Sequence, residues 1–159
     1  MDGRLLRRSE WLALFALCAA YLEGGLFKLH DFAGAVAEMR HFGVAPAAPA
    51  ALAVIALEIV APLMILSRRG RWIGASALAA FTLAASVVAD AFWSAAGPER
   101  FGLTNAFLEH LGLAGAFVLV ACRDLAERRA AVELAAVRAR TVASTFGALR
   151  KPPDSIPES

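Results

Sequence analysis

Four long apolar runs constrain this chain more than any other feature of its sequence. They cover residues 11–29, 50–66, 72–93 and 104–122. Each is close to the roughly 20 residues that a transmembrane helix needs. Open sheets do not cross lipid, because their edge groups would lack hydrogen-bond partners there. The runs therefore predict an all-α integral membrane protein built as a four-helix transmembrane bundle, with residues 30–49 and 94–103 as loops.

The overall composition supports a lipid bilayer as the main partner of the chain. Hydrophobic residues make up 59% of it and charged residues only 19%, whereas soluble domains carry about 25% charged residues. The net charge is +2, and the cations cluster beside the apolar runs, where membrane insertion alone explains them. Nucleic-acid binding is therefore not predicted.

The placement of the basic residues predicts the orientation in the membrane. Arginines precede the first run, fill the short turn between the second and third, and follow the fourth. In the two remaining loops, the only lysine or arginine residues are Arg40 and Arg100. Because basic loops stay in the cytoplasm, both termini of this multi-pass protein are predicted to be cytoplasmic.

The chain changes character after the fourth run. Residues 1–122 are predicted to form the transmembrane domain, and residues 123–150 a cytoplasmic basic helix that extends it. This helix either continues the fourth span into solvent or lies on the anionic membrane surface or a partner. Residues 151–159 form a disordered tail by composition.

Glu58 is the most informative single residue, because it lies in the middle of the second apolar run. A charged side chain at the centre of a membrane helix costs about 2.5–3.5 kcal/mol on insertion scales, so it usually has a partner. Pro62 follows four residues later and has no N–H to give to the carbonyl of Glu58. We therefore expect a helix kink at Pro62 that leaves a free backbone acceptor beside the carboxylate.

Other polar residues gather in the outer, periplasmic half of the predicted bundle. With Glu58 near mid-depth, they form a candidate intramembrane pocket: Lys28, Asp90, Asn105, Glu109 and His110. The alternative is that several of these side chains only reach toward the lipid headgroups. Asp90 and His110 flank a short connection, which predicts that they meet across antiparallel helices and form a proton relay. Small residues at 76, 80 and 84 predict a tightly packed helix face.

No catalytic residues and no metal site are predicted. The chain has no nucleophile paired with a base, no phosphate-binding loop and no cofactor fingerprint. Glu109 and His110 are adjacent on a helix and point about 100° apart, which does not suit a shared metal. A haem held by His30 and His110 would need ligands deeper on facing helices.

Several short motifs, in order and spacing, resemble the DoxX family of small four-helix bacterial membrane proteins. They are residues 24–31, residues 42–46, Glu58, residues 71–75, Phe92 with Trp93, and residues 107–115. The resemblance implies a bacterial inner-membrane protein. It also implies relatives that serve as membrane subunits of oxidoreductase systems, such as thiosulfate:quinone oxidoreductase or a mycobacterial thiol-stress complex.

The chain matches the family pattern at Lys28 and Glu58 and departs from it at two positions. Asp90 stands where the pattern commonly has His, and His110 where it commonly has Asn. A proton-transfer role carried over from the family therefore does not transfer directly to either position.

Two functions of different classes follow from the sequence. In the first, the protein is a subunit or partner of a quinone-linked oxidoreductase or redox-stress system. Lys28 or His110 then hydrogen-bonds a quinone carbonyl, and Glu58 or Asp90 exchanges protons. In the second, the protein is a non-catalytic membrane scaffold, or binds or transports a small molecule. The sequence predicts no other cofactor, and a soluble or membrane redox protein is the expected partner.

Overall fold

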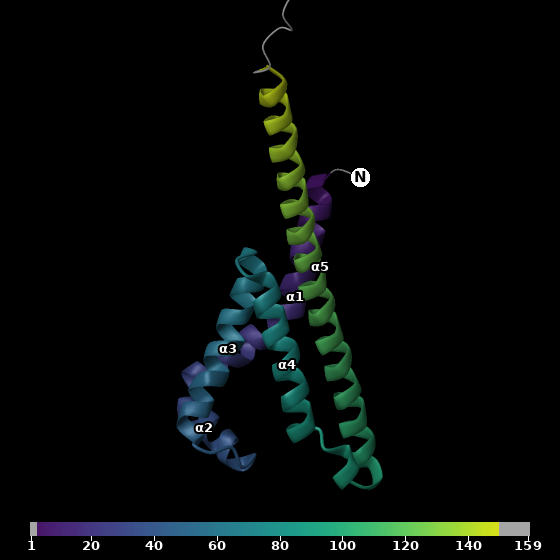
Figure 1. Ribbon diagram of the computed structural model, residues 1–159. Helices are drawn as coiled ribbons and strands as arrows, with labels where there is room; N and C mark the ends of the chain where they lie inside the picture. Colours follow the sequence, from purple (N-terminus) through teal and green to yellow (C-terminus); the bar gives the residue numbers. More distant parts are fainter. Residues whose placement is uncertain (1–2, 150–159) are drawn as a thin grey trace, which may run out of the picture. The chain divides into compact units, whose positions relative to one another are not determined.

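The computed structural model describes residues 3–149, and the predicted tail at 151–159 lies outside the described residues. The described part holds no strand. Its elements are α1 (Gly3–His30), α2 (Phe32–His41), α3 (Ala47–Ser67), α4 (Arg71–Ala89), a 3-10 turn η1 (Phe92–Ser94) and α5 (Gly97–Leu149) (Figure 1). The chain divides into two units, Met1–Asp124 and Leu125–Ser159, and α5 belongs to both.

Four helical segments are long and apolar enough to cross a membrane. They are Arg8–His30, Ala47–Ser67, Arg71–Ser94 and Gly97–Ala143. The all-α, four-span membrane fold predicted from the apolar runs is therefore confirmed. In the second unit, residues 125–149 continue as helix, which confirms a helical extension, while its cytoplasmic location stays a prediction.

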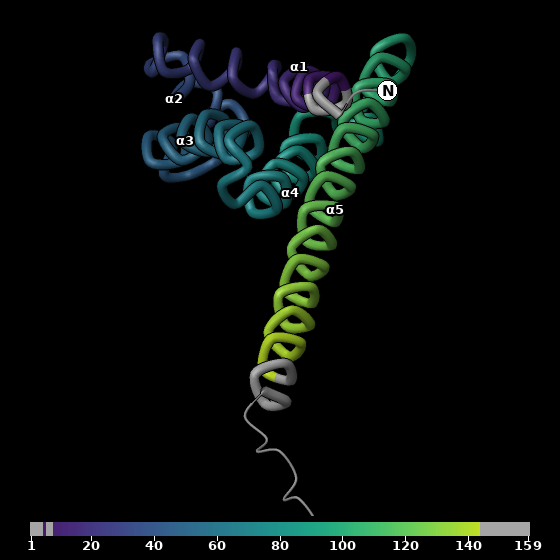
Figure 2. The backbone as a smooth tube through the Cα atoms, turned by 90° about the horizontal axis from the view of Figure 1, so that it is seen from above, coloured from purple at the N-terminus to yellow at the C-terminus, as the bar shows by residue number. Residues whose placement is uncertain are grey.

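Helices α1, α2 and α4 all pack against α3 (Figure 2). Two glycines permit close approach. A Cβ atom on Gly25 would lie 2.9 Å from Cγ1 of Ile59, and one on Gly74 would lie 2.6 Å from the carbonyl oxygen of Ala61. The expected small-residue face at 76, 80 and 84 is instead exposed. The tight contact of α4 occurs at Gly74, where only hydrogen fits.

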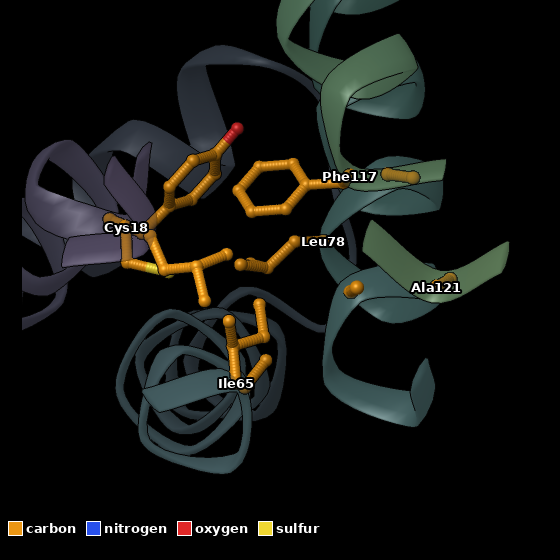
Figure 3. Packing of buried hydrophobic residues seen from close by; sticks show 10 residues of the cluster. Cys18, Ile65, Leu78, Phe117 and Ala121 are labelled. Atoms are coloured by element: carbon orange, nitrogen blue, oxygen red, sulfur yellow. The ribbon is translucent and has the colours of Figure 1, made fainter. Parts of the chain in front are cut away.

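The main hydrophobic core joins α1, α3, α4 and the first part of α5. Cys18, Ile65, Leu78 and Phe117 are completely shielded within it (Figure 3). The ring of Tyr21 packs edge-on against Phe117, with their centroids 5.4 Å apart. The aromatic pair closes the core where it meets the polar groups described below.

Arg71 ties together the end of the bundle that contains the α3–α4 turn. Its Nε donates to the carbonyl oxygen of Ile65 at 3.1 Å, and its Nη1 lies 3.0 Å from Oε1 of Glu10. The guanidinium is buried, so these contacts supply the partners that a desolvated charge requires. One side chain thus links α1, α3 and α4.

Helix α2 differs from the loop predicted for residues 30–49. The Asp31 carboxylate caps it by accepting a hydrogen bond from the backbone N–H of Gly34 at 2.9 Å. Ala35 and Met39, one turn apart, are buried against Ala51 and Ile55 of α3. A local cap and a two-residue apolar face stabilise a helix too short to register as a membrane-spanning run.

The turn between the last two spans also differs in detail. The third apolar run was expected to be helical to residue 93, but α4 ends at Ala89, and Asp90 is its C-cap. The last span begins at Gly97, not at residue 104, and Gly97 has φ +60°. Asp90 therefore lies at the C-terminal end of α4, whereas Asn105, Glu109 and His110 lie well inside α5.

Candidate functional site

The carboxylate of Glu58 forms an ion pair with the ammonium of Lys28. Nζ of Lys28 lies 3.0 Å from Oε1 and 3.1 Å from Oε2 of Glu58. The side chain of Glu58 is 7% exposed and that of Lys28 is 18% exposed. Because an unpaired carboxylate at this depth would be costly, the pair accounts for a charge in the middle of α3.

Gly24 leaves room for this pair. A Cβ atom there would lie 3.6 Å from Oε2 of Glu58 and 3.7 Å from Nζ of Lys28, which is ordinary contact distance. Gly25 faces the backbone of α3 and sets how closely the two helices approach. The two adjacent glycines thus differ: Gly24 lies beside the ion pair, and Gly25 allows α1 and α3 to approach closely.

A polar cavity of about 270 Å³ lies beside the ion pair. It is lined by residues of α1, α2, α3, α4 and the first part of α5, including Tyr21, Lys28, Glu58, Thr82 and His110. A lysine ammonium has one more N–H than the two oxygens of Glu58 accept, so one donor remains for a bound molecule. We call this space the polar cavity.

Tyr21 and Thr82 add a second polar pair to the same cavity. The hydroxyl of Thr82 donates to the carbonyl of Leu78 at 2.7 Å. The hydroxyl of Tyr21 contacts Oγ1 of Thr82 and is therefore the donor in that bond. The phenolic oxygen of Tyr21 keeps its acceptor capacity, so the cavity offers both a donor and an acceptor.

Asp90 and His110 lie in contact across the connection between α4 and α5. Oδ2 of Asp90 is 2.6 Å from Nδ1 of His110. When the carboxylate is ionised it only accepts, so Nδ1 is then the donor and, in a neutral ring, Nε2 is left as an acceptor. Asp90 is buried, whereas the side chain of His110 is 44% exposed and also lines the polar cavity. The geometry suits a proton relay, and that role stays a prediction.

Asn105 and Glu109 do not join this group. Both are exposed on α5, and the side chain of neither forms a hydrogen bond or ion pair with the residues that the structure describes. They lie at a level on α5 similar to that of His110, but on a side of the helix that faces away from the cavity. Of the predicted pocket residues, the structure brings Lys28, Glu58 and His110 to one cavity and places Asp90 behind His110. Pro62 is buried in α3, which continues past it to Ser67, and the kink stays a prediction.

Glu38 of α2 was missed from the sequence. It borders the polar cavity and also two neighbouring spaces. One, the vestibule, has a volume of about 320 Å³ and carries the carboxylates of Glu23, Asp31 and Glu38. The helical spacing of Ala35 and Met39 after a capping Asp31 is the signal that would have placed Glu38 on a helix facing α3.

The second neighbouring space, the apolar slot, has a volume of about 300 Å³. It is lined by residues of α1, α2, α3 and α4 and of the α2–α3 loop, all of them apolar except Lys28 and Glu38. Lys28 and Glu38 therefore border all three spaces. Among the described residues, no three His, Cys, Asp or Glu side chains are grouped so as to hold a metal ion.

Comparison with known proteins assigns the family. The sequence model described as DoxX matches residues 12–91, which is half of the chain and extends from α1 through the end of α4. The chain belongs to the DoxX family. No curated protein and no solved structure matches it. As a DoxX protein with four apolar helices, it is a multi-pass membrane protein.

The matched DoxX segment contains part of the site. Lys28, Glu58 and Asp90 lie within residues 12–91, whereas His110 lies beyond them. The ion pair is therefore formed wholly within the family segment. The imidazole that completes the cavity comes from the part of this chain that the match does not cover.

Proposed function

We propose that this DoxX protein is the membrane subunit or partner of a quinone-linked oxidoreductase or redox-stress system, located in the bacterial inner membrane with both termini cytoplasmic. The observation that carries the proposal is the polar cavity built around Lys28 and Glu58. Its volume of about 270 Å³ is just below the usual range for small-molecule sites, which begins at about 300 Å³.

The side chains of the cavity suit a ring bearing carbonyl oxygens. Lys28 donates its remaining N–H to one such oxygen, and the phenolic oxygen of Tyr21 accepts from a hydroxyl once the ring is reduced. The buried ion pair keeps these groups in position. Donor and acceptor together fit both the oxidised and the reduced form of a quinone.

The same side chains can exchange protons with a bound quinone. Reduction takes up one proton for each electron, and the electrons come from the partner oxidoreductase. His110 lines the cavity, and its contact with Asp90 holds the imidazole in one orientation. Glu58 is the second proton-exchanging group, and the vestibule carboxylates give it a polar route outward.

Co-purification tests this proposal. The full chain is purified from native membranes in mild detergent, and its lipids, quinones and accompanying proteins are identified by mass spectrometry. We expect the purified protein to carry more quinone per chain than the co-purified membrane lipid accounts for. A Lys28→Met, Glu58→Gln double variant should lose this quinone. Asn105→Ala is the matched control. Asn105 lies near His110 along α5, but it is exposed and does not line the cavity.

The contrary result supports a different function. If wild-type protein and the double variant carry equal background amounts of quinone, the cavity is not a quinone site. A protein partner retained in both would then favour the membrane scaffold, whose buried charges only hold the helices in register.

A further inference from the structure

The apolar slot opens toward the lipid side of α4. Ala84, Val88 and Ala89 line it and are exposed on that helix. In a bilayer, exposed apolar positions in the middle and outer part of a membrane helix face acyl chains. The slot is therefore reached sideways from lipid, whereas the vestibule, with its three carboxylates, suits water and protons.

The slot and the polar cavity share a wall. Lys28, Glu38, Phe81 and Ala85 border both spaces. These four residues come from α1, α2 and α4, so the two spaces lie side by side at this point. A molecule long enough to occupy both spaces would pass the side chain of Lys28.

The two spaces differ in chemistry. The polar cavity offers an ammonium, a phenol, a hydroxyl and an imidazole, and the slot offers methyl groups and rings from residues such as Met39, Val54 and Phe81. Burying apolar area stabilises a complex by about 25 cal/mol per Å². An occupant gains from both spaces only when it has a polar head and an apolar tail.

We propose that the apolar slot is the tail site of a carbonyl-headed, membrane-dissolved amphiphile whose head lies in the polar cavity. The proposal rests on the proposed function and adds to it the route by which the ligand enters and the need for an apolar tail. The ligand enters from the bilayer between α2, α3 and α4, and its affinity depends on its tail as well as on its ring.

Paired quinone probes test the tail requirement. Decylubiquinone and the same quinone ring without a tail are titrated into the full chain in phospholipid nanodiscs, and each Kd is measured by calorimetry. Ala84→Phe places a ring in the slot. We expect it to raise the Kd of decylubiquinone by about tenfold or more, which is about 1.4 kcal/mol, and to leave the Kd of the tail-less ring within about twofold.

Ala80→Phe is the matched control. Ala80 lies one turn earlier on the same exposed face of α4 and lines none of the three spaces. A second variant and control on α3 keep the test possible if Ala84→Phe does not fold. Ala50→Leu narrows the slot, whereas Ala53→Leu changes an exposed residue outside it. Thermal unfolding of every variant is recorded beside its Kd.

The outcomes separate the two proposals. If wild-type protein binds neither quinone, the proposed function itself is wrong. If it binds both, and the slot variants alter tailed binding no more than their controls, the head site stands and the tail site is overturned. Loss of tailed binding alone, in Ala84→Phe or Ala50→Leu but not in the controls, supports the tail site.

Discussion

Nζ of Lys28 lies within 3.1 Å of both carboxylate oxygens of Glu58, although 30 residues separate the two in the chain. The contact joins the C-terminal end of α1 to the middle of α3, and all three spaces described above border Lys28. The pair is therefore both a structural link between helices and the boundary of the site.

Breaking this pair should destabilise the fold. Lys28→Met leaves the Glu58 carboxylate buried and uncompensated, which we expect to cost about 3–5 kcal/mol in the free energy of unfolding. The double variant Lys28→Met, Glu58→Gln removes both charges and should recover most of that loss. Unfolding in detergent, followed by circular dichroism, measures both. Equal destabilisation in the single and double variants would mean that the charges do not depend on each other.

The contact between Asp90 and His110 predicts energetic coupling. Asp90→Asn and His110→Gln, alone and combined, form a double-mutant cycle. We expect a coupling energy of at least about 0.5 kcal/mol in stability, because each side chain loses its main partner when the other is changed. Strictly additive losses in the unfolding measurements would contradict an interaction between the two.

The adjacent glycines of α1 should respond differently to the same change. Gly25→Ala forces a methyl group against Ile59 and Glu58, and we expect this overpacking to cost about 1–3 kcal/mol. Gly24→Ala meets only ordinary contacts. Because alanine favours helix by up to about 1 kcal/mol, that variant should be neutral or more stable. Unfolding temperatures that fall equally in both variants would argue against the close approach at Gly25.

Pro62→Ala tests the predicted acceptor beside Glu58. Alanine restores an N–H that can bond the carbonyl of Glu58, so the helix gains a hydrogen bond. We expect insertion and stability to be kept and quinone binding to weaken. The measurements are membrane yield, unfolding temperature and Kd. Unchanged binding would show that the carbonyl of Glu58 has no part in the site.

The predicted orientation can be checked by cysteine labelling. In a Cys122→Ser background, single cysteines at Arg40 and Arg100 should react with an impermeant thiol reagent added from the periplasm, and one at Arg69 should not. Cys18 is completely buried and can stay. Periplasmic labelling at Arg69 would reverse the orientation and place the polar cavity in the cytoplasmic half.

From the sequence, the level of a polar residue along the bundle was easier to predict than the side of the helix on which it lies. Glu58 stood out because a carboxylate in a long apolar run needs a partner, yet nothing in the sequence alone paired it with Lys28. Asn105 and Glu109 have a similar depth to His110 but lie on the exposed side of α5. A membrane helix is apolar toward lipid as well as toward its neighbours, so hydrophobic periodicity gives little information on which side faces inward.

Short elements were the other limit. Helix α2 depends on one capping carboxylate and a two-residue apolar face, a signal weaker than the runs on either side. Glu38 was missed for that reason. Arg71 was counted only toward the orientation, whereas its side chain is buried and bonded to two other helices.

The packing of Tyr21 on Phe117 separates the polar cavity from the hydrophobic core on one side. Tyr21 lines the cavity and packs on Phe117, which is completely shielded in the core, and Arg71 ties the helices together at the far end. If the site exchanges protons as proposed, we expect them to pass through the vestibule and not through this core. The exchange would then respond to the pH on one side of the bilayer only.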